Sequence, residues 1–122
     1  MIAIDHVGIM ARDAASSAGF LAEILGLEPP LPVGPDGDIF HLDIGGTGIL
    51  LYFPAETVIG QHIAFRVDQE TFEIVVKRLR AKGVVFGNDP EDQTNMQTTD
   101  FLEGHGRVFF RDPNSHLFEV MA

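Results

Sequence analysis

One short pattern occurs twice in the chain, and this repeat constrains the fold more than any other feature. Residues 5–11 read DHVGIMA, and residues 61–67 read QHIAFRV. In each copy a histidine opens a run in which apolar residues alternate, which is the period of a strand with one buried face. An aspartate, an amphipathic segment and a glycine follow in both copies, and this order predicts a capped helix. We therefore expect two copies of one supersecondary unit.

The elements expected in the two halves follow the same order. The first half predicts a strand over 2–11, a helix over 14–25, a loop over 29–37 and a hairpin from 38–44 and 48–53. The second half predicts a strand over 61–67, a helix between Asp68 and Gly83, a short strand over 84–86, a long polar segment over 87–106 and a hairpin from 107–111 and 116–121. The prediction is an α+β fold in which two βαβββ modules, about 1–57 and 58–122, make a single domain.

Composition and charge narrow the classes of function. The 122 residues carry a formal net charge of −10 and no cysteine. An acidic chain is unsuited to the phosphates of nucleic acid and to an anionic membrane surface, and the lack of cysteine excludes thiolate catalysis. No stretch reaches the roughly 20 apolar residues of a membrane span. The first residues lack the apolar run of a signal peptide, so we expect a cytoplasmic protein whose partner is a small molecule.

Aligning the two halves points to a possible metal site. An offset of 56 residues places His6 on His62, and an offset of 68 places the last hairpin on the first, with Glu119 at the position of Leu51. Alternation puts His6, His62 and Glu119 each on the strand face turned away from the predicted core. Two imidazoles and a carboxylate suit one divalent ion such as Mn, Fe, Co, Ni or Zn, with positions left for water or substrate. The three residues therefore form the predicted ligand set.

Each of these residues also has a plain structural interpretation. A histidine at the start of a strand is often exposed, and a glutamate in the last strand is often an edge charge. Two histidines at equivalent positions of a repeat favour a shared site. The residues alone leave both interpretations open.

The same motifs resemble those of the vicinal oxygen chelate superfamily, also called the glyoxalase/bleomycin resistance/dioxygenase superfamily. The resemblance covers essentially the whole chain. It rests on the two histidine motifs, on LRAKGV at 79–84 and above all on RDPNSHLFEV at 111–120. Membership would imply a cup-shaped mixed sheet made by the two modules, with helices outside, one metal ion held by His6, His62 and Glu119, and often a homodimer.

Details of the pattern separate the branches of this superfamily. Glyoxalase I and the epimerases have a fourth protein ligand at the position where this chain has Leu51. The chain departs from their pattern there. The three-ligand pattern is similar to that of the fosfomycin-modifying enzymes and the extradiol dioxygenases, and GHGR at 104–107 is nearest to the former. Both groups typically have a tyrosine at the position of Phe109. The resemblance therefore implies a metal-dependent enzyme that activates vicinal oxygens by Lewis acidity. An iron(II) dioxygenase and a non-catalytic drug-binding protein remain as alternatives.

Other residues on the same strand faces are candidates for chemistry or binding. His41, which aligns with Phe109, could act as a general acid or base, or could be a hydrogen-bonded residue of the wall. Arg66 and Arg107 could hold an anionic group of a substrate, or could pair with acidic residues of this chain. Leu51 and Phe109, together with other apolar residues, would make the wall largely apolar, so a small substrate with an apolar part is expected.

Overall fold

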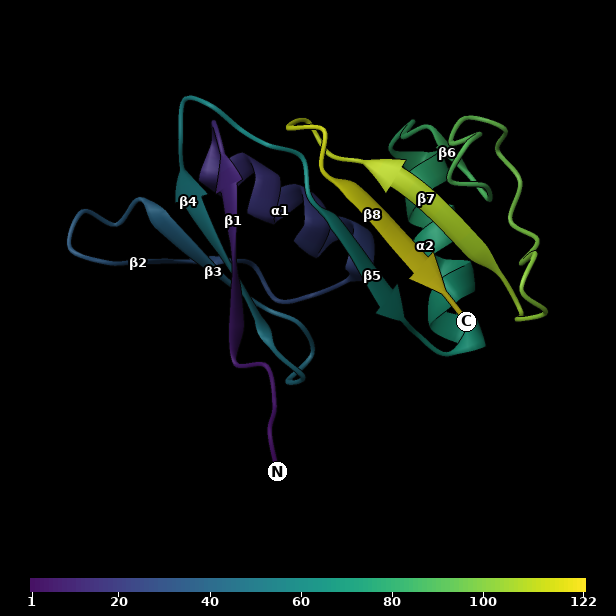
Figure 1. The fold of residues 1–122 in the computed structure, drawn as a ribbon, viewed down its shortest axis with the longest axis horizontal. Coiled ribbons are helices and arrows are strands. Elements are labelled where there is room, and N and C mark those ends of the chain that lie inside the picture. Colours follow the sequence, from purple (N-terminus) through teal and green to yellow (C-terminus); the bar gives the residue numbers. More distant parts are fainter. The chain divides into compact units, whose positions relative to one another are not determined.

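The computed structural model describes all residues from Met1 to Ala122 and divides into two compact units, Met1–Ile59 and Gly60–Ala122. Each unit contains one helix and one four-stranded mixed sheet (Figure 1). The order of elements is βαβββ in both, which confirms the predicted α+β fold of two modules. The boundary between the units follows Ile59.

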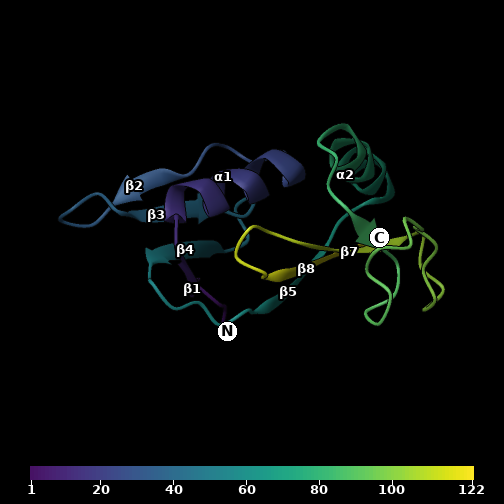
Figure 2. The ribbon, with the colours of Figure 1, turned by 90° about the horizontal axis from the view of Figure 1, so that it is seen from above.

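The first unit has the strand order β1-β4-β3-β2. Its elements are β1 (His6–Ala11), α1 (Ala14–Leu25), β2 (Leu31–Val33), β3 (Ile39–Asp43) and β4 (Ile49–Pro54). The Asp13 carboxylate accepts a hydrogen bond from the backbone N–H of Ser16 and so caps α1, and Gly26 ends the helix with φ at +70°. A left-handed residue is the common way to end a helix, and glycine adopts it without strain. Figure 2 shows α1 over one face of this sheet.

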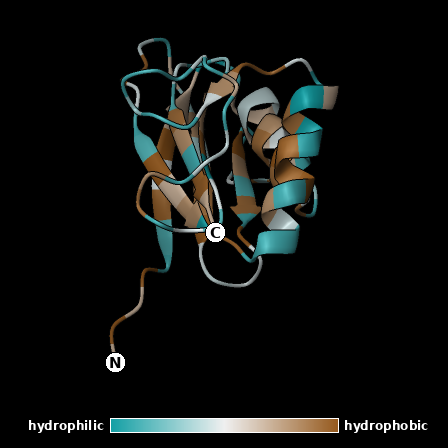
Figure 3. Ribbon diagram, turned by 90° about the vertical axis from the view of Figure 1, so that its right-hand side faces the viewer, coloured by the Kyte–Doolittle hydropathy of each residue, from teal (hydrophilic) through white to brown (hydrophobic).

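The second unit repeats this arrangement with the strand order β5-β8-β7-β6. Its elements are β5 (His62–Arg66), α2 (Gln69–Ala81), β6 (Phe86–Gly87), β7 (Arg107–Arg111) and β8 (Leu117–Met121). Asp68 caps α2 through the backbone N–H of Thr71. The helix buries one apolar stripe, made by Phe72, Val75, Val76 and Leu79. Hydrophobic and hydrophilic residues accordingly alternate around its turns in Figure 3.

The strand register confirms that the two modules are equivalent. In the first unit His6 pairs with Ile49 and His41 pairs with Leu51. In the second unit His62 pairs with Leu117 and Phe109 pairs with Glu119. These pairs are related by the offsets of 56 and 68 residues that the sequence predicted. Glu119 therefore occupies the position of Leu51, and Phe109 occupies that of His41.

Three predicted elements differ from those of the structure. The short strand expected over 84–86 lies at Phe86–Gly87. Residues 2–5 lie outside β1, whose pairing with β4 begins at His6 and Ile49. The residues before Ile49 form the turn between β3 and β4, in which the backbone N–H of Thr47 donates to the carbonyl of Ile44, so they offer no strand for 2–5. The loop expected over 29–37 contains the short strand β2, in which Pro32 pairs with Phe40. Proline lacks the N–H that an interior strand needs, but β2 lies at the edge of its sheet, where proline is tolerated.

No helix of the structure is both long enough and apolar enough to cross a membrane. The long segment between β6 and β7 has turns and one isolated bridge, Asp89–Asp92, but no regular element. It was predicted to lack regular structure, and this is confirmed.

Candidate metal centre

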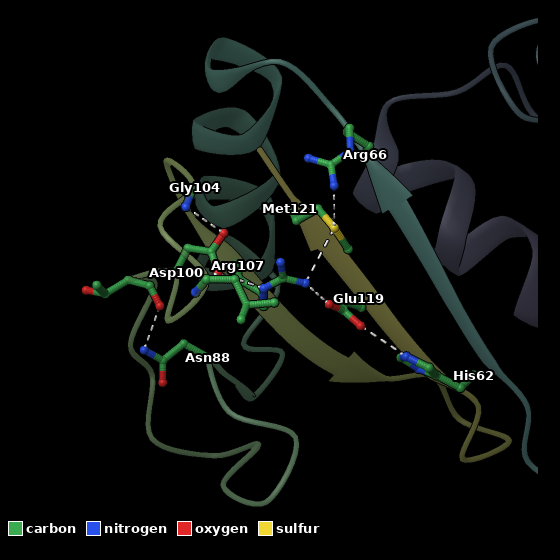
Figure 4. Close-up of polar contacts among 10 residues, drawn as sticks. His62, Arg66, Asn88, Asp100, Gly104, Arg107, Glu119 and Met121 are labelled. Carbon is green, nitrogen blue, oxygen red and sulfur yellow. Dashed lines mark hydrogen bonds and ion pairs between the residues drawn. The ribbon is translucent and has the colours of Figure 1, made fainter.

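Two of the three predicted ligands lie together in the second unit. The parallel pairing of β5 with β8 places Ala64 beside Glu119 and His62 beside Leu117. His62 and Glu119 are thus diagonal neighbours on the face that α2 does not cover, where long side chains can meet. His62 Nε2 lies 3.0 Å from Glu119 Oε1 (Figure 4). The side chain of Glu119 is only 10% exposed, whereas that of His62 is 49% exposed.

The second ring nitrogen of His62 indicates how the first is used. Nδ1 lies 3.1 Å from the carbonyl oxygen of Leu117. A carbonyl oxygen only accepts hydrogen bonds, so Nδ1 donates. Nε2 then either donates to Glu119 as part of an imidazolium ion or faces the carboxylate with a lone pair. In the second case the lone pairs of His62 Nε2 and Glu119 Oε1 point toward the same position, as two ligands of one metal ion do.

The distance between the two donor atoms fits a shared ion. Histidine nitrogen and carboxylate oxygen lie about 2.0–2.2 Å from an ion such as zinc, and at these distances two neighbouring donor atoms of an octahedral ion lie about 3 Å apart. The observed separation of Nε2 and Oε1 is 3.0 Å. The residues therefore fit as one edge of a divalent-metal site.

Glu119 is held from its other oxygen by Arg107, the first residue of β7. Arg107 Nη1 donates to Glu119 Oε2, and Arg107 Nε donates to Asp100 Oδ1 at 2.9 Å. The side chains of Arg107 and Asp100 are 8% and 4% exposed. The hydrogen bond between them lowers the pKa of Asp100 and raises the pKa of Arg107. Asp100 and Arg107 are therefore charged at neutral pH, and Arg107 leaves Oε1 of Glu119 facing His62.

Arg66 lies farther along the same face. Its Nη2 is 3.5 Å from Met121 Sδ, and the same sulfur lies 3.4 Å from Arg107 Nη1 (Figure 4). A thioether is a weak acceptor. The guanidinium of Arg66 is exposed, so it is a cationic group on the same face as the predicted ligands His62 and Glu119.

Phe109 forms the wall behind His62. The two rings stack with their centroids 6.2 Å apart, and Phe109 is almost fully buried. Its position next to Glu119 on β8 follows from the antiparallel pairing of β7 with β8. Phe109 therefore places an apolar ring beside the imidazole.

The remaining predicted residues lie in the first unit. His6 is exposed at the start of β1, and its Nδ1 lies 2.7 Å from Asp5 Oδ2. This contact orients the ring and leaves Nε2 free, as in metal-binding histidines whose other nitrogen contacts a carboxylate. His41 on β3 and Leu51 on β4 are paired half-buried residues. No group of three histidine or acidic side chains gathers as a complete metal site.

Sequence reasoning missed two acidic residues that contact predicted site residues. Asp5 was noted only as part of a motif, although it contacts His6. Asp100 lies within the long polar segment, and no periodicity there could have pointed to it. The expectation that Arg107 could pair with an acidic residue was the only available signal, and several acidic residues of the segment gave that signal equally.

The chain matches the model of the Glyoxalase/Bleomycin resistance protein/Dioxygenase superfamily over residues 3–120. No curated protein sequence matches it. Among solved structures it resembles "Oxidase ChaP-H2", with a TM-score of 0.89 and 30% identity, covering 99% of this chain and 93% of that chain. "Oxidase ChaP-H1" has a TM-score of 0.90 at 28% identity, covering 100% and 96%.

The fosfomycin resistance protein FosX from Listeria monocytogenes has a TM-score of 0.74 at 20% identity, covering 100% of this chain and 93% of that chain. At that identity the likeness concerns the fold alone. The two oxidases are similar in both fold and sequence.

Proposed function

The chain belongs to the Glyoxalase/Bleomycin resistance protein/Dioxygenase superfamily, and from its site residues we propose that it is a metal-dependent enzyme acting on a small molecule. The observation that supports this most directly is the 3.0 Å contact between His62 Nε2 and Glu119 Oε1. The other nitrogen of His62 contacts the Leu117 carbonyl, and the other oxygen of Glu119 contacts Arg107. We propose that His6 supplies the third ligand. The metal would be one divalent ion among Mn, Fe, Co, Ni and Zn.

The ligand set suits an ion that keeps open coordination positions. Two imidazoles and one carboxylate are the donors of many catalytic sites of this kind. Leu51 stands where a fourth ligand would be and offers no donor atom. When bound, the metal supplies Lewis acidity toward substrate oxygens or, if it is iron(II), the capacity to react with oxygen.

The protein residues have separate roles in this proposal. Arg66 binds an anionic group of the substrate, because its guanidinium has only a thioether as its protein partner. Leu51 and Phe109 provide apolar wall and exclude water. His41 donates or accepts a proton at its imidazole during the reaction. The sequence left two roles open for Arg107, and its pairing with Asp100 and Glu119 favours the structural one over contact with substrate.

An oxidative reaction with iron(II) is the second candidate. It is supported by the 30% identity with a protein described as an oxidase. Lewis-acid activation without oxygen, as in the glyoxalase and fosfomycin resistance branches, is supported by the three-ligand pattern. The substrate of either reaction is expected to be small, with vicinal oxygens and an apolar part.

Metal content measured together with oxygen consumption tests these proposals. The purified protein, its His62→Ala and Glu119→Gln variants and a His105→Ala control would be loaded with Fe²⁺, Mn²⁺ or Zn²⁺, desalted and analysed for bound metal. His105 is an exposed loop histidine whose side chain is outside the ligand set. We expect about one metal per chain in the wild type and the control, and a loss in both ligand variants.

Wild-type protein that retains no more metal than the ligand variants would disprove the metal centre. Oxygen consumption by the iron-loaded protein with a set of catechols separates the oxidative reaction from the non-oxidative one. Metal binding without turnover of any class of substrate would favour a binding protein. We also propose that the protein is a homodimer, which light scattering of the purified chain would test.

A further inference from the structure

The long segment between β6 and β7 contains a side chain that reaches the candidate metal centre through one intermediate. Asp100 contacts Arg107, and Arg107 contacts Glu119, the proposed ligand (Figure 4). We propose that Asp100 and Arg107 are positioning residues that commit Glu119 to binding metal through Oε1 alone. This inference rests on the proposed function and extends it to a loop that the function does not otherwise use.

Asp100 is itself held in place on several sides. Its Oδ1 accepts a hydrogen bond from the backbone N–H of Leu102 at 2.9 Å, and its Oδ2 accepts one from Gly104 at 3.1 Å. The backbone N–H of His105 donates to the carbonyl of Ala122 at 2.7 Å, which ties the same turn to the end of β8. The carboxylate that faces Arg107 is therefore fixed by backbone, not by a mobile side chain.

Arg107 is also enclosed. The Phe101 ring lies over its guanidinium, with 5.4 Å between Cζ and the ring centroid, and its backbone N–H donates to the carbonyl of Thr98 at 3.0 Å. Because the guanidinium is planar, a fixed Nε edge determines the direction of the Nη1 edge. Holding Nε on Asp100 thus fixes where Nη1 meets Glu119.

The charges of this buried group do not balance. Asp100 and Glu119 carry two negative charges, and Arg107 carries one positive charge, in a group whose side chains are 4–10% exposed. Buried charge is costly unless it is compensated. The excess negative charge lies toward Oε1, beside Nε2 of His62, where either an imidazolium ion or a bound metal ion compensates it.

Removing the charge of Asp100 would change this balance. With asparagine at position 100, Arg107 has Glu119 as its only anionic partner, and the full charge of the guanidinium opposes metal binding at that carboxylate. Residues that orient metal ligands typically contribute about 10–100-fold to metal affinity. We therefore expect Asp100→Asn to weaken metal binding by about that factor while His62 and Glu119 remain unchanged.

The test is Co²⁺ titration of the full-length, metal-free protein, followed by calorimetry and by visible absorption. The wild type would be compared with Asp100→Asn, Arg107→Lys and the control Asp92→Asn, which removes an equal charge from an exposed position of the same segment. A lysine in place of Arg107 would keep the positive charge but could not span two carboxylates. We expect the control to match wild type, and Asp100→Asn and Arg107→Lys to bind Co²⁺ about 10–100-fold more weakly with an altered absorption spectrum.

Wild-type affinity and an unchanged spectrum in Asp100→Asn or in Arg107→Lys would overturn the inference. If Asp100→Asn does not fold, Arg107→Lys decides by the same two measurements. Wild-type protein that takes up no Co²⁺ would instead refute the proposed metal centre, and the positioning role with it. Equal weakening in Asp92→Asn would show a general effect of charge and would also overturn the inference.

Discussion

His62 Nε2 lies 3.0 Å from Glu119 Oε1, across the neighbouring parallel strands β5 and β8. The other nitrogen of the imidazole faces the Leu117 carbonyl, and the other oxygen of the carboxylate faces Arg107. Each group therefore has one engaged atom and one atom turned toward the other group. This arrangement leads to predictions about metal binding, pH dependence and stability.

The exposed residue His6 should be needed for metal binding although little of the fold depends on it. We expect saturating metal, at about 100 times its dissociation constant, to stabilise the wild type by about 2.7 kcal/mol. His6→Ala should lose most of this gain and keep the stability of the metal-free protein. Thermal unfolding with and without metal measures both. A full gain in His6→Ala would remove His6 from the ligand set.

The stability that Asp100 contributes should depend on pH. Arg107 holds the pKa of Asp100 below its ordinary value of 3.8, so the contribution is fully present above that value and is lost as the pH falls further, through the lowered pKa. We expect Asp100→Asn to be less stable than wild type at neutral pH by about 2 kcal/mol, as for hydrogen bonds between charged groups. The difference should shrink below about pH 4.

Urea unfolding of metal-free protein over a series from about pH 7 down to about pH 3 measures this difference directly. The Asp92→Asn protein serves as the control, with a small difference from wild type. A difference between Asp100→Asn and wild type that stays constant over the whole series would contradict the assignment of the contribution to a charged Asp100.

Phe118 should be among the costliest residues to truncate in the second unit. It is fully buried and lies between Phe65 and Phe110, with ring centroids 6.1 and 5.8 Å away. Phe118→Ala should cost about 3–5 kcal/mol, because it removes a large side chain and leaves a cavity. Ile59→Ala, at a residue that is 81% exposed, should change the free energy of unfolding by less than about 0.5 kcal/mol. Chemical denaturation compares the two.

Replacing Gly19 and Gly87 with alanine should have opposite effects on the stability of the protein. Gly19 lies within α1, and a Cβ there would meet nothing within 4 Å. Gly19→Ala should therefore stabilise the protein by up to about 1 kcal/mol through helix propensity. A Cβ at Gly87 would lie 2.7 Å from the backbone carbon of Gln93 and would also meet the Asp92 carbonyl, so Gly87→Ala should destabilise. Equal melting temperatures of the two variants would contradict this contrast.

Much of the fold could be predicted from the sequence because the repeat is encoded locally. Asp13 and Asp68 begin their helices through hydrogen bonds to residues three positions away, and alternation along the strands separates buried from exposed faces. The offsets of 56 and 68 residues then predicted the register found in both sheets. The strand β2 was missed because its Pro32 is acceptable only at a sheet edge, and edge position is a property of the assembled sheet.

The sequence by itself determined the modules, their register and the candidate residues His62 and Glu119, because backbone periodicity and capping act over a few residues. The tertiary structure decided which side chains engage those residues. The role of Arg107 was open between substrate and acidic partners until the structure placed it between Asp100 and Glu119. Asp100 lies in a segment without periodicity, and its contact depends on where that segment returns to the sheet. Such contacts depend on the distance between side chains after folding, which local sequence patterns do not encode.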